Sequence, residues 1–284
     1  MIGVTVPSLF PMKTHPSAWS VVLFSLALAL SPALSAQPAA PTPAVNPPVP
    51  AVVAPPAAPA VRPNTALIPV PQRAEDRLPQ NAINGFNTRH QNYVALAKKG
   101  DIDLLFLGDS ITQNWGGPGK AVWTQYYGAM KAVAFGVGYD RTQHLLWRLQ
   151  NGEGEGFSPK AVVLMIGTNN IGLNTPAEIA AGVGTIVHEV RTRFASAKIL
   201  LLGIFPRDLP NSRNRKLVAD TNQLISALND GQHVFYLDLT DKFVGPDGTI
   251  PTDVMADRPP LHPTAKGHAI WAEAIKEPLA KLME

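Results

Sequence analysis

The chain has 284 residues, of which 45% are hydrophobic and none is cysteine. This length allows one or two folded domains, and the lack of cysteine excludes disulfide frameworks, thiolate nucleophiles and cysteine-ligated zinc sites. The formal net charge is only +3, without a dense run of Lys and Arg, so the sequence argues against a nucleic-acid partner.

Residues 1–36 have the pattern of a secretory signal peptide. Lys13 precedes the apolar stretch AWSVVLFSLALAL, and the small residues ALSA follow at 33–36. The apolar run is short for a bilayer span, so it predicts export to the periplasm and cleavage, leaving no stable membrane span; a retained anchor is the alternative. Met12 is an alternative start of the natural chain.

Residues 37–74 are predicted to form a disordered linker. Positions 37–63 are almost entirely Ala, Pro and Val, a composition that cannot build a packed core and favours extended, polyproline-like conformations. From about residue 75 apolar runs alternate with amphipathic segments, so the folded domain is expected at 75–284.

Five apolar runs in this domain predict β-strands, at 104–108, 131–136, 160–167, 198–205 and 233–239. Most are nearly continuous in Val, Ile, Leu and Phe, which is typical of strands that are covered on both faces. Amphipathic stretches predict helices at 92–100, 142–152, 176–194, 214–230 and 263–283. Alternation of strand and helix indicates a three-layer α/β domain with a parallel sheet.

Polar residues gather where three of the predicted strands end. The clusters are Gly108-Asp109-Ser110, Gly138-Tyr139-Asp140 and Gly167-Thr168-Asn169-Asn170. A further pair, Asp257 and His262, precedes the last predicted helix. Ligands in parallel α/β sheets bind beyond the carboxyl ends of the strands, so these residues should converge on one rim.

The residue types at this rim fit acyl transfer. Ser110 supplies a hydroxyl, although Gly-Asp-Ser is also an ordinary turn sequence. His262 is the natural base because imidazole titrates near neutral pH. His144 is expected to be a helix-packing residue, and His268, inside the last predicted helix, is expected to pack or to face solvent. Asn169 ends a very apolar strand, and its amide either donates to an oxyanion or caps the following loop.

Two other chemistries fit the sequence poorly. His188-Glu189 is followed by Thr192 where a zinc-binding HExxH motif needs histidine. The FGVGYD stretch lacks the third glycine of a dinucleotide fingerprint, because Arg141 occupies that position.

Four sequence blocks, in order along the chain, resemble the blocks typical of the SGNH, or GDSL-type, hydrolases. Within that family the chain is most similar to the catalytic subunits of platelet-activating factor acetylhydrolase and their bacterial relatives. The blocks are FLGDSIT, FGVGYDRTQHLLWRLQNGE, VVLMIGTNN and LHPTAKGHAIWAEAI. The resemblance implies a flavodoxin-like fold with a five-stranded parallel sheet and no cofactor. It also implies that Ser110 is the nucleophile, His262 the general base and Asn169 an oxyanion donor.

The chain departs from the family pattern at two places. Tyr139 stands where the family has a glycine whose backbone N–H binds the oxyanion; its N–H remains, so the predicted oxyanion hole is Ser110, Tyr139 and Asn169. A positive φ would strain Tyr139, whose ring is expected to line or narrow the pocket and favour small acyl groups. Asp257 lies five residues before His262 instead of three; Asp253, or a Ser-His dyad, is the alternative.

The sequence therefore predicts a secreted serine esterase that hydrolyses short-chain, chiefly acetyl, esters of carbohydrates, lipids or small molecules through Ser110, His262 and Asp257. Asp109, Trp115 and Tyr139 are expected to contact the substrate, and Trp123 to pack inside. The alternatives are an acyltransferase that uses the same triad and a non-catalytic binding module on a degenerate esterase fold.

Overall fold

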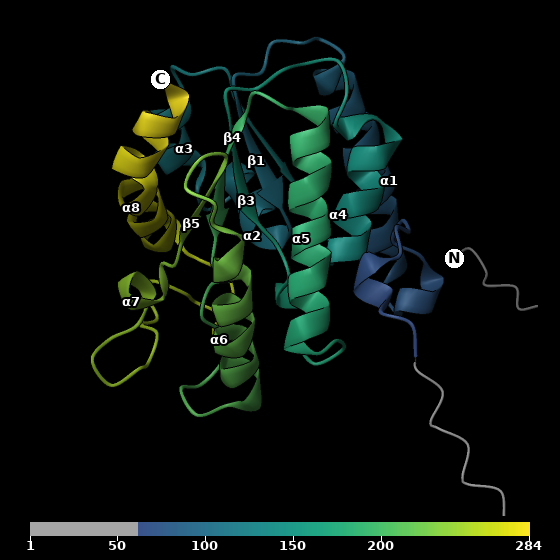
Figure 1. The fold of residues 1–284 in the computed structure, drawn as a ribbon. Helices are drawn as coiled ribbons and strands as arrows, with labels where there is room; N and C mark the ends of the chain where they lie inside the picture. Colours follow the sequence, from purple (N-terminus) through teal and green to yellow (C-terminus); the bar gives the residue numbers. More distant parts are fainter. Residues whose placement is uncertain (1–61) are drawn as a thin grey trace, which may run out of the picture. The chain divides into compact units, whose positions relative to one another are not determined.

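The computed structural model describes residues 62–284 (Figure 1). The predicted signal peptide and the linker up to residue 61 lie outside the described residues. The chain folds into a central parallel sheet with helices on both faces, as the alternation of strands and helices predicts.

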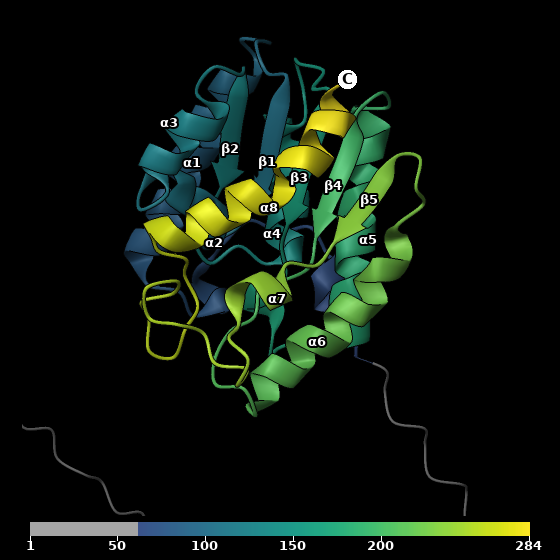
Figure 2. The same cartoon turned by 90° about the vertical axis from the view of Figure 1, so that its left-hand side faces the viewer.

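The sheet has five parallel strands in the order β2-β1-β3-β4-β5, which Figure 2 shows from left to right. The strands are β1 (Leu104–Gly108), β2 (Ala132–Gly136), β3 (Ala161–Met165), β4 (Lys198–Leu202) and β5 (Val234–Leu237). The five predicted strands are confirmed, with β3, β4 and β5 shorter than expected. Since β1 pairs with both β2 and β3, the strand order reverses beside β1, and ligands bind at such a switch point.

Two helical layers cover the sheet. One layer, to the right in Figure 1, contains α1 (Gln80–Ala97), α4 (Thr142–Arg148) and α5 (Pro176–Arg193), and α6 (Arg213–Ile225) packs on the same face. The other contains α3 (Lys120–Tyr127), α7 (Thr240–Phe243) and α8 (Ala265–Met283). None of the helices within residues 62–284 is long and apolar enough to cross a bilayer.

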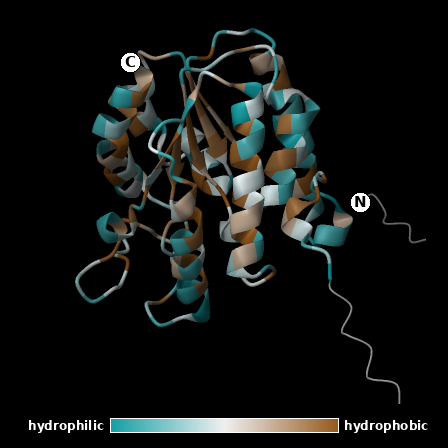
Figure 3. Cartoon of the chain, in the orientation of Figure 1, coloured by the Kyte–Doolittle hydropathy of each residue, from teal (hydrophilic) through white to brown (hydrophobic). Residues whose placement is uncertain are grey.

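Each strand contributes side chains to two hydrophobic cores. Leu105 and Leu107 of β1 face the core under α4 and α5, whereas Leu104 and Phe106 face the core under α3 and α8. The strands are accordingly the most uniformly hydrophobic elements in Figure 3. Burial on both faces explains why their sequences are continuous apolar runs and do not alternate.

The segment before α1 contradicts the linker prediction for residues 62–74. We call residues 62–79 the N-terminal strap; it contains two short 3₁₀ turns (Thr65–Leu67 and Ala74–Asp76) and lies against the domain. Ala66 is fully buried, and its carbonyl accepts a hydrogen bond of 2.9 Å from the Thr142 hydroxyl. Composition misleads here because backbone, amide and ionic contacts dock the strap, and such contacts leave no apolar pattern in the sequence.

Candidate active site

The site begins at the sharp passage from β1 into α2 (Ser110–Gln113). Asp109 caps this single helical turn by accepting a hydrogen bond of 3.0 Å from the Ile111 N–H, which makes Ser110 its first residue. A Cβ at Gly108 would lie 2.2 Å from the Thr112 hydroxyl oxygen, and one at Gly136 would lie 2.2 Å from the Gln113 nitrogen. Glycine is needed at both strand ends because α2 presses directly onto them.

His262 lies against Ser110 although 152 positions separate them in the chain. The Ser110 Oγ and His262 Nε2 atoms are 2.9 Å apart. On the other side of the ring, Nδ1 is 2.6 Å from Asp257 Oδ2, and the same oxygen accepts a bond of 2.8 Å from the His262 backbone N–H. Hydroxyl, imidazole and carboxylate thus form one continuous hydrogen-bonded series.

The structure brings Asp257, and not Asp253, to the imidazole. The two extra residues between Asp257 and His262 are accommodated in the loop, whose Pro260 carbonyl accepts a bond of 2.9 Å from the Asp208 N–H. Asp253 instead binds the Lys266 ammonium at 2.6 Å. The longer spacing therefore preserves the carboxylate–imidazole contact.

The third element is a set of N–H groups near Ser110. Within residues 62–284, the backbone N–H groups of Ser110 and Tyr139 donate to no protein acceptor. Asn169 follows β3 and donates one amide N–H to the Asp140 carbonyl at 2.9 Å. A carboxamide carries a second N–H. Asn169 is therefore held beside the Tyr139 loop by one N–H and keeps the other available for a ligand.

Tyr139 has a positive φ, the conformation that would strain a residue other than glycine at this position. Its φ is 64°, a left-handed conformation that costs a non-glycine residue about 1 kcal/mol or more. Its side chain is 49% exposed and, with α1 residues such as Asn81 and Phe86, lines a small cavity of about 150 Å³. Tyr139 therefore lies on the side of the loop that faces α1 and is about half exposed.

Two of the predicted substrate contacts, Asp109 and Trp115, are wrong because both side chains are buried. Asp109 is fully buried, one of its carboxylate oxygens has no partner in residues 62–284, and burial raises its pKa to about 7. Trp115 is 1% exposed and packs against Phe106 and Trp271. Trp123 packs against Phe106 and Tyr127, as predicted, and its half-buried side chain also lines a surface groove.

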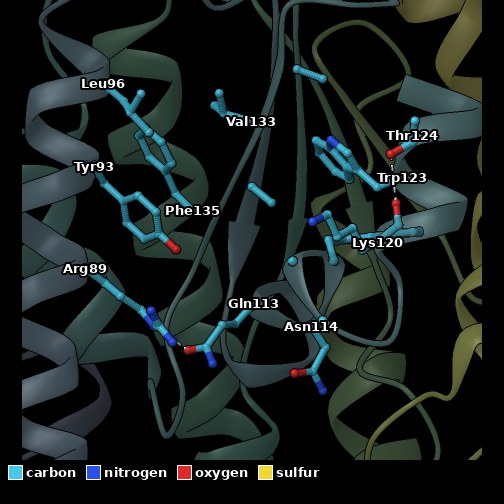
Figure 4. Close-up of a pocket in the computed structure, with 15 residues that line it drawn as sticks. Arg89, Tyr93, Leu96, Gln113, Asn114, Lys120, Trp123, Thr124, Val133 and Phe135 are labelled. Carbon is cyan, nitrogen blue, oxygen red and sulfur yellow. Dashed lines mark hydrogen bonds between the residues drawn. The ribbon is translucent and has the colours of Figure 1, made fainter. Parts of the chain in front are cut away.

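That groove follows the edge strand β2 between α1 and α3 and has a volume of about 620 Å³ (Figure 4). Arg89 and Tyr93 line it from α1, and Lys120 and Trp123 from α3. Arg89 donates to the Gln113 side-chain oxygen at 2.8 Å, and the Gly138 N–H donates to the same oxygen at 2.8 Å. One end of the groove is thereby joined to the loop that carries Tyr139.

A buried ionic network under this loop was not predicted. Arg148 binds Asp140 at 2.7 Å, pairs with Glu153, and donates to the carbonyls of Gly108 and Phe135, each at 3.2 Å. Asp140, Arg148 and Glu153 are all fully buried; burial raises the pKa of Asp140, and the Arg148 charge opposes that rise. The available signal was an arginine inside the apolar stretch HLLWRL with a glutamate five residues later.

The other two histidines near the site are buried, which confirms packing for His144 and selects packing over exposure to solvent for His268. His268 is fully buried in α8; it contacts the Thr264 carbonyl at 2.8 Å through Nδ1, and burial lowers its pKa. His144 is also fully buried, and its Nδ1 accepts a bond of 3.1 Å from the Arg141 N–H. His262 is therefore the histidine placed to exchange a proton with Ser110.

Comparison with known proteins points to one family. The model of the GDSL-like Lipase/Acylhydrolase family matches residues 106–270. The rat platelet-activating factor acetylhydrolase IB subunit alpha2 is 36% identical over 219 residues, covering 76% of this chain and 91% of the relative. The human alpha1 subunit is 34% identical over 195 residues, covering 68% and 82%. A solved lipolytic G-D-S-L family protein from Veillonella parvula shares the fold, with a TM-score of 0.54 at 16% identity over 63% of this chain and 99% of that one.

Proposed function

The chain belongs to the GDSL-like lipase/acylhydrolase family and is an ester-hydrolysing enzyme, and we propose that it removes short acyl groups, chiefly acetyl, from carbohydrate, lipid or small-molecule alcohols. The preference for acetyl is supported by relatives that are named acetylhydrolases. Membership of an esterase family leaves no support for the alternative of a non-catalytic binding module.

The proposed reaction starts with attack of the Ser110 Oγ on the ester carbonyl carbon. The hydroxyl proton moves to His262 Nε2, and the carbonyl π electrons move onto the oxygen, which becomes an oxyanion. Asp257 keeps the Nδ1 proton in place and stabilises the imidazolium. When the oxyanion collapses, the ester C–O bond breaks and the leaving alcohol takes the proton from His262. Water then attacks the acyl-enzyme by the same route, releasing the acid and free Ser110.

The oxyanion is assigned to three donors: the backbone N–H groups of Ser110 and Tyr139 and the side-chain amide of Asn169. Donors of this kind act most strongly where charge develops in the transition state, and loss of one costs roughly 3 to 4 kcal/mol of that stabilisation. The absence of a protein acceptor for the two backbone N–H groups, within residues 62–284, supports the assignment.

The observation that carries the proposal is the Ser110–His262–Asp257 series, with contacts of 2.9 and 2.6 Å. A nucleophile in reach of a base, which is in turn oriented by a carboxylate, is the arrangement that acyl transfer requires. These contacts join a residue after β1 to two residues before α8, so they do not arise from closeness in sequence.

The direct test measures hydrolysis of p-nitrophenyl acetate by the purified enzyme and by Ser110→Ala. We expect loss of at least about 10⁴-fold in kcat, because the covalent step needs the Ser110 oxygen. A fluorophosphonate probe should label the wild type at Ser110 and leave the variant unlabelled. Equal rates in the two proteins would contradict the proposal, and acyl transfer to an added sugar in preference to water would indicate a transferase.

We also propose that the chain is exported to the periplasm, on the evidence of the signal-like sequence at 1–36. Expression of the full chain and sequencing of the mature amino terminus test this proposal. Cleavage near residue 36 in the periplasmic fraction is expected, and an uncleaved cytoplasmic product would contradict it.

A further inference from the structure

Gln72 of the N-terminal strap reaches the loop that carries Tyr139. Its side-chain nitrogen donates to the Gly138 carbonyl at 2.7 Å and to Asp140 Oδ1 at 2.8 Å. Gln72 is 3% exposed, and both of its partners are acceptors, so the amide nitrogen must face them. A residue outside the predicted domain therefore binds on both sides of Tyr139.

The Gly138 carbonyl and the Tyr139 N–H belong to the same peptide group. In a planar trans peptide the C=O and N–H bonds point in opposite directions. A donor that holds the carbonyl oxygen therefore also fixes the direction of the N–H. Gln72 binds the carbonyl side of this peptide. The Tyr139 N–H lies on the opposite side and has no protein acceptor within residues 62–284.

The neighbouring polar groups of the loop are also held, by parts of the chain that are far apart in sequence. The Gly138 N–H donates to Gln113, the Asp140 carbonyl accepts from Asn169, and the second Asp140 carboxylate oxygen accepts from Arg148. The Tyr139 φ of 64° is unfavourable for tyrosine, and such a conformation persists only where its surroundings enforce it.

We propose that Gln72 is a positioning residue of the esterase, which holds the Gly138–Tyr139 peptide so that its N–H points at the oxyanion; the inference rests on the proposed function. Gln72 touches neither substrate nor Ser110. It acts through the peptide, and its effect should appear in the transition state, where the oxyanion exists, and not in substrate binding.

A purely structural role for Gln72 would be to fasten the strap to the domain. Several other contacts already do so: Arg62 with Glu178 at 2.8 Å, Asn64 with the Glu178 carbonyl at 3.2 Å, and Asp76 with Arg141 at 2.9 Å. These contacts do not involve the loop residues 138–140. Asn64→Ala is therefore a matched control that loosens the strap without touching the Gly138–Tyr139 peptide.

The experiment compares the full chain with its variants Gln72→Met, Gln72→Asn and Asn64→Ala, and uses p-nitrophenyl acetate as the substrate. A trifluoromethyl ketone serves as the inhibitor, because the Ser110 hydroxyl adds to its carbonyl carbon and gives an oxyanion. For Gln72→Met we expect kcat to fall by about 10- to 100-fold with KM within about twofold, and affinity for the ketone to fall by the same factor as kcat/KM. Gln72→Asn, one methylene shorter, should behave alike. Asn64→Ala should keep kcat within about twofold.

Wild-type kcat in a folded Gln72→Met or Gln72→Asn protein would overturn the inference, as would an equal loss of kcat in Asn64→Ala or a loss confined to KM. If Gln72→Met does not fold, Gln72→Asn decides by the same criteria. These failures leave the proposed function intact, provided that the wild type hydrolyses the ester and Ser110 is labelled. A wild type that does neither refutes the proposed function, and the inference falls with it.

Discussion

The acid–base pair and the ionic network under the Tyr139 loop are both sets of charged or titratable groups, yet they lie in opposite environments. The side chains of His262 and Asp257 are 33% and 43% exposed, whereas Asp140, Arg148 and Glu153 have no exposed surface. The groups proposed to handle protons thus meet solvent on a loop, and the groups that bind the ends of β1 and β2 are buried inside the domain. This separation implies that changes at the loop should mainly affect rate, and changes in the network should first affect stability.

The sharpest test of this contrast is His262→Ala. We expect kcat for p-nitrophenyl acetate to fall by about 10⁴-fold or more, because Ser110 loses its base. The free energy of unfolding should change by less than about 1 kcal/mol, since the ring is partly exposed. Activity assays and urea denaturation measure the two effects, and a large loss of stability would break the comparison.

The converse variant is Arg148→Met, which removes the cation shared by two buried carboxylates and leaves Asp140 with Gln72 and Glu153 with His90 as remaining partners. We expect the free energy of unfolding to fall by about 3 to 5 kcal/mol. Arg193→Met is the control, because Arg193 pairs with Glu189 near the surface and should cost less than about 1 kcal/mol. Equal losses of the free energy of unfolding for the two variants in urea denaturation would show that the buried network stabilises the fold no more than a surface ion pair does.

The buried Asp109 carboxyl makes the free energy of unfolding depend on pH. Its pKa of about 7 in the folded state lies above the value of 3.8 expected for an exposed aspartate, so the folded state binds its proton more tightly. Asp109 therefore contributes fully to the free energy of unfolding below about pH 4, and this contribution is lost as the pH rises through about 7. The loss amounts to a few kcal/mol, since a tenfold change in proton affinity corresponds to about 1.4 kcal/mol. Asp109→Asn should remove this slope from a pH series of denaturation curves. An unchanged slope would exclude Asp109 as its source.

Asp257→Asn measures how much the exposed orienting group contributes. We expect kcat to fall by about 10⁴-fold, because the amide neither stabilises the imidazolium nor holds the imidazole in the reactive tautomer. Asp253→Asn, on the same loop but bound to Lys266, should leave kcat within about twofold. A larger loss of kcat in Asp253→Asn than in Asp257→Asn would show that Asp253, and not Asp257, orients His262.

The smallest expected effect belongs to Tyr139→Gly. Relief of the left-handed conformation should raise the free energy of unfolding by up to about 1 kcal/mol, part of which is offset by the greater entropy of the unfolded glycine chain. If the ring restricts the acyl site, the ratio of p-nitrophenyl butyrate to acetate hydrolysis should rise several-fold. An unchanged ratio would place the ring outside the acyl site.

The sheet and the positions of the proposed catalytic residues could be predicted because each leaves a local pattern. Continuous apolar runs marked the strands, and the polar residues at their ends marked the rim, where Ser110, Asn169 and His262 were found. The short helices α2, α3 and α7 were not predicted, and α1 begins at Gln80, well before the helix predicted at 92–100. Helix α2 has a single turn, and the sequence KAVWTQYY of α3 carries aromatic residues without a clear apolar stripe.

The supporting residues could not be predicted because their roles depend on contacts between distant segments. Gln72 lies in a stretch rich in Pro and Ala, and nothing nearby in sequence shows that its partners are Gly138 and Asp140. Trp115 and Trp123 are eight residues apart and chemically identical, but only the fold decides which is buried. Asp257 could be favoured over Asp253, although the spacing alone did not settle the choice.

The hydrogen bonds between Ser110 and His262, and between Gln72 and Gly138, have a consequence for synthesis. The ribosome makes residue 72 early and residue 262 late, and both must be present before the site is whole. A nascent chain that has released its first four strands already holds Ser110, yet it has no base to activate that hydroxyl. On the proposed mechanism, ester cleavage therefore begins only after the loop ahead of the last helix has been made and has folded against Ser110.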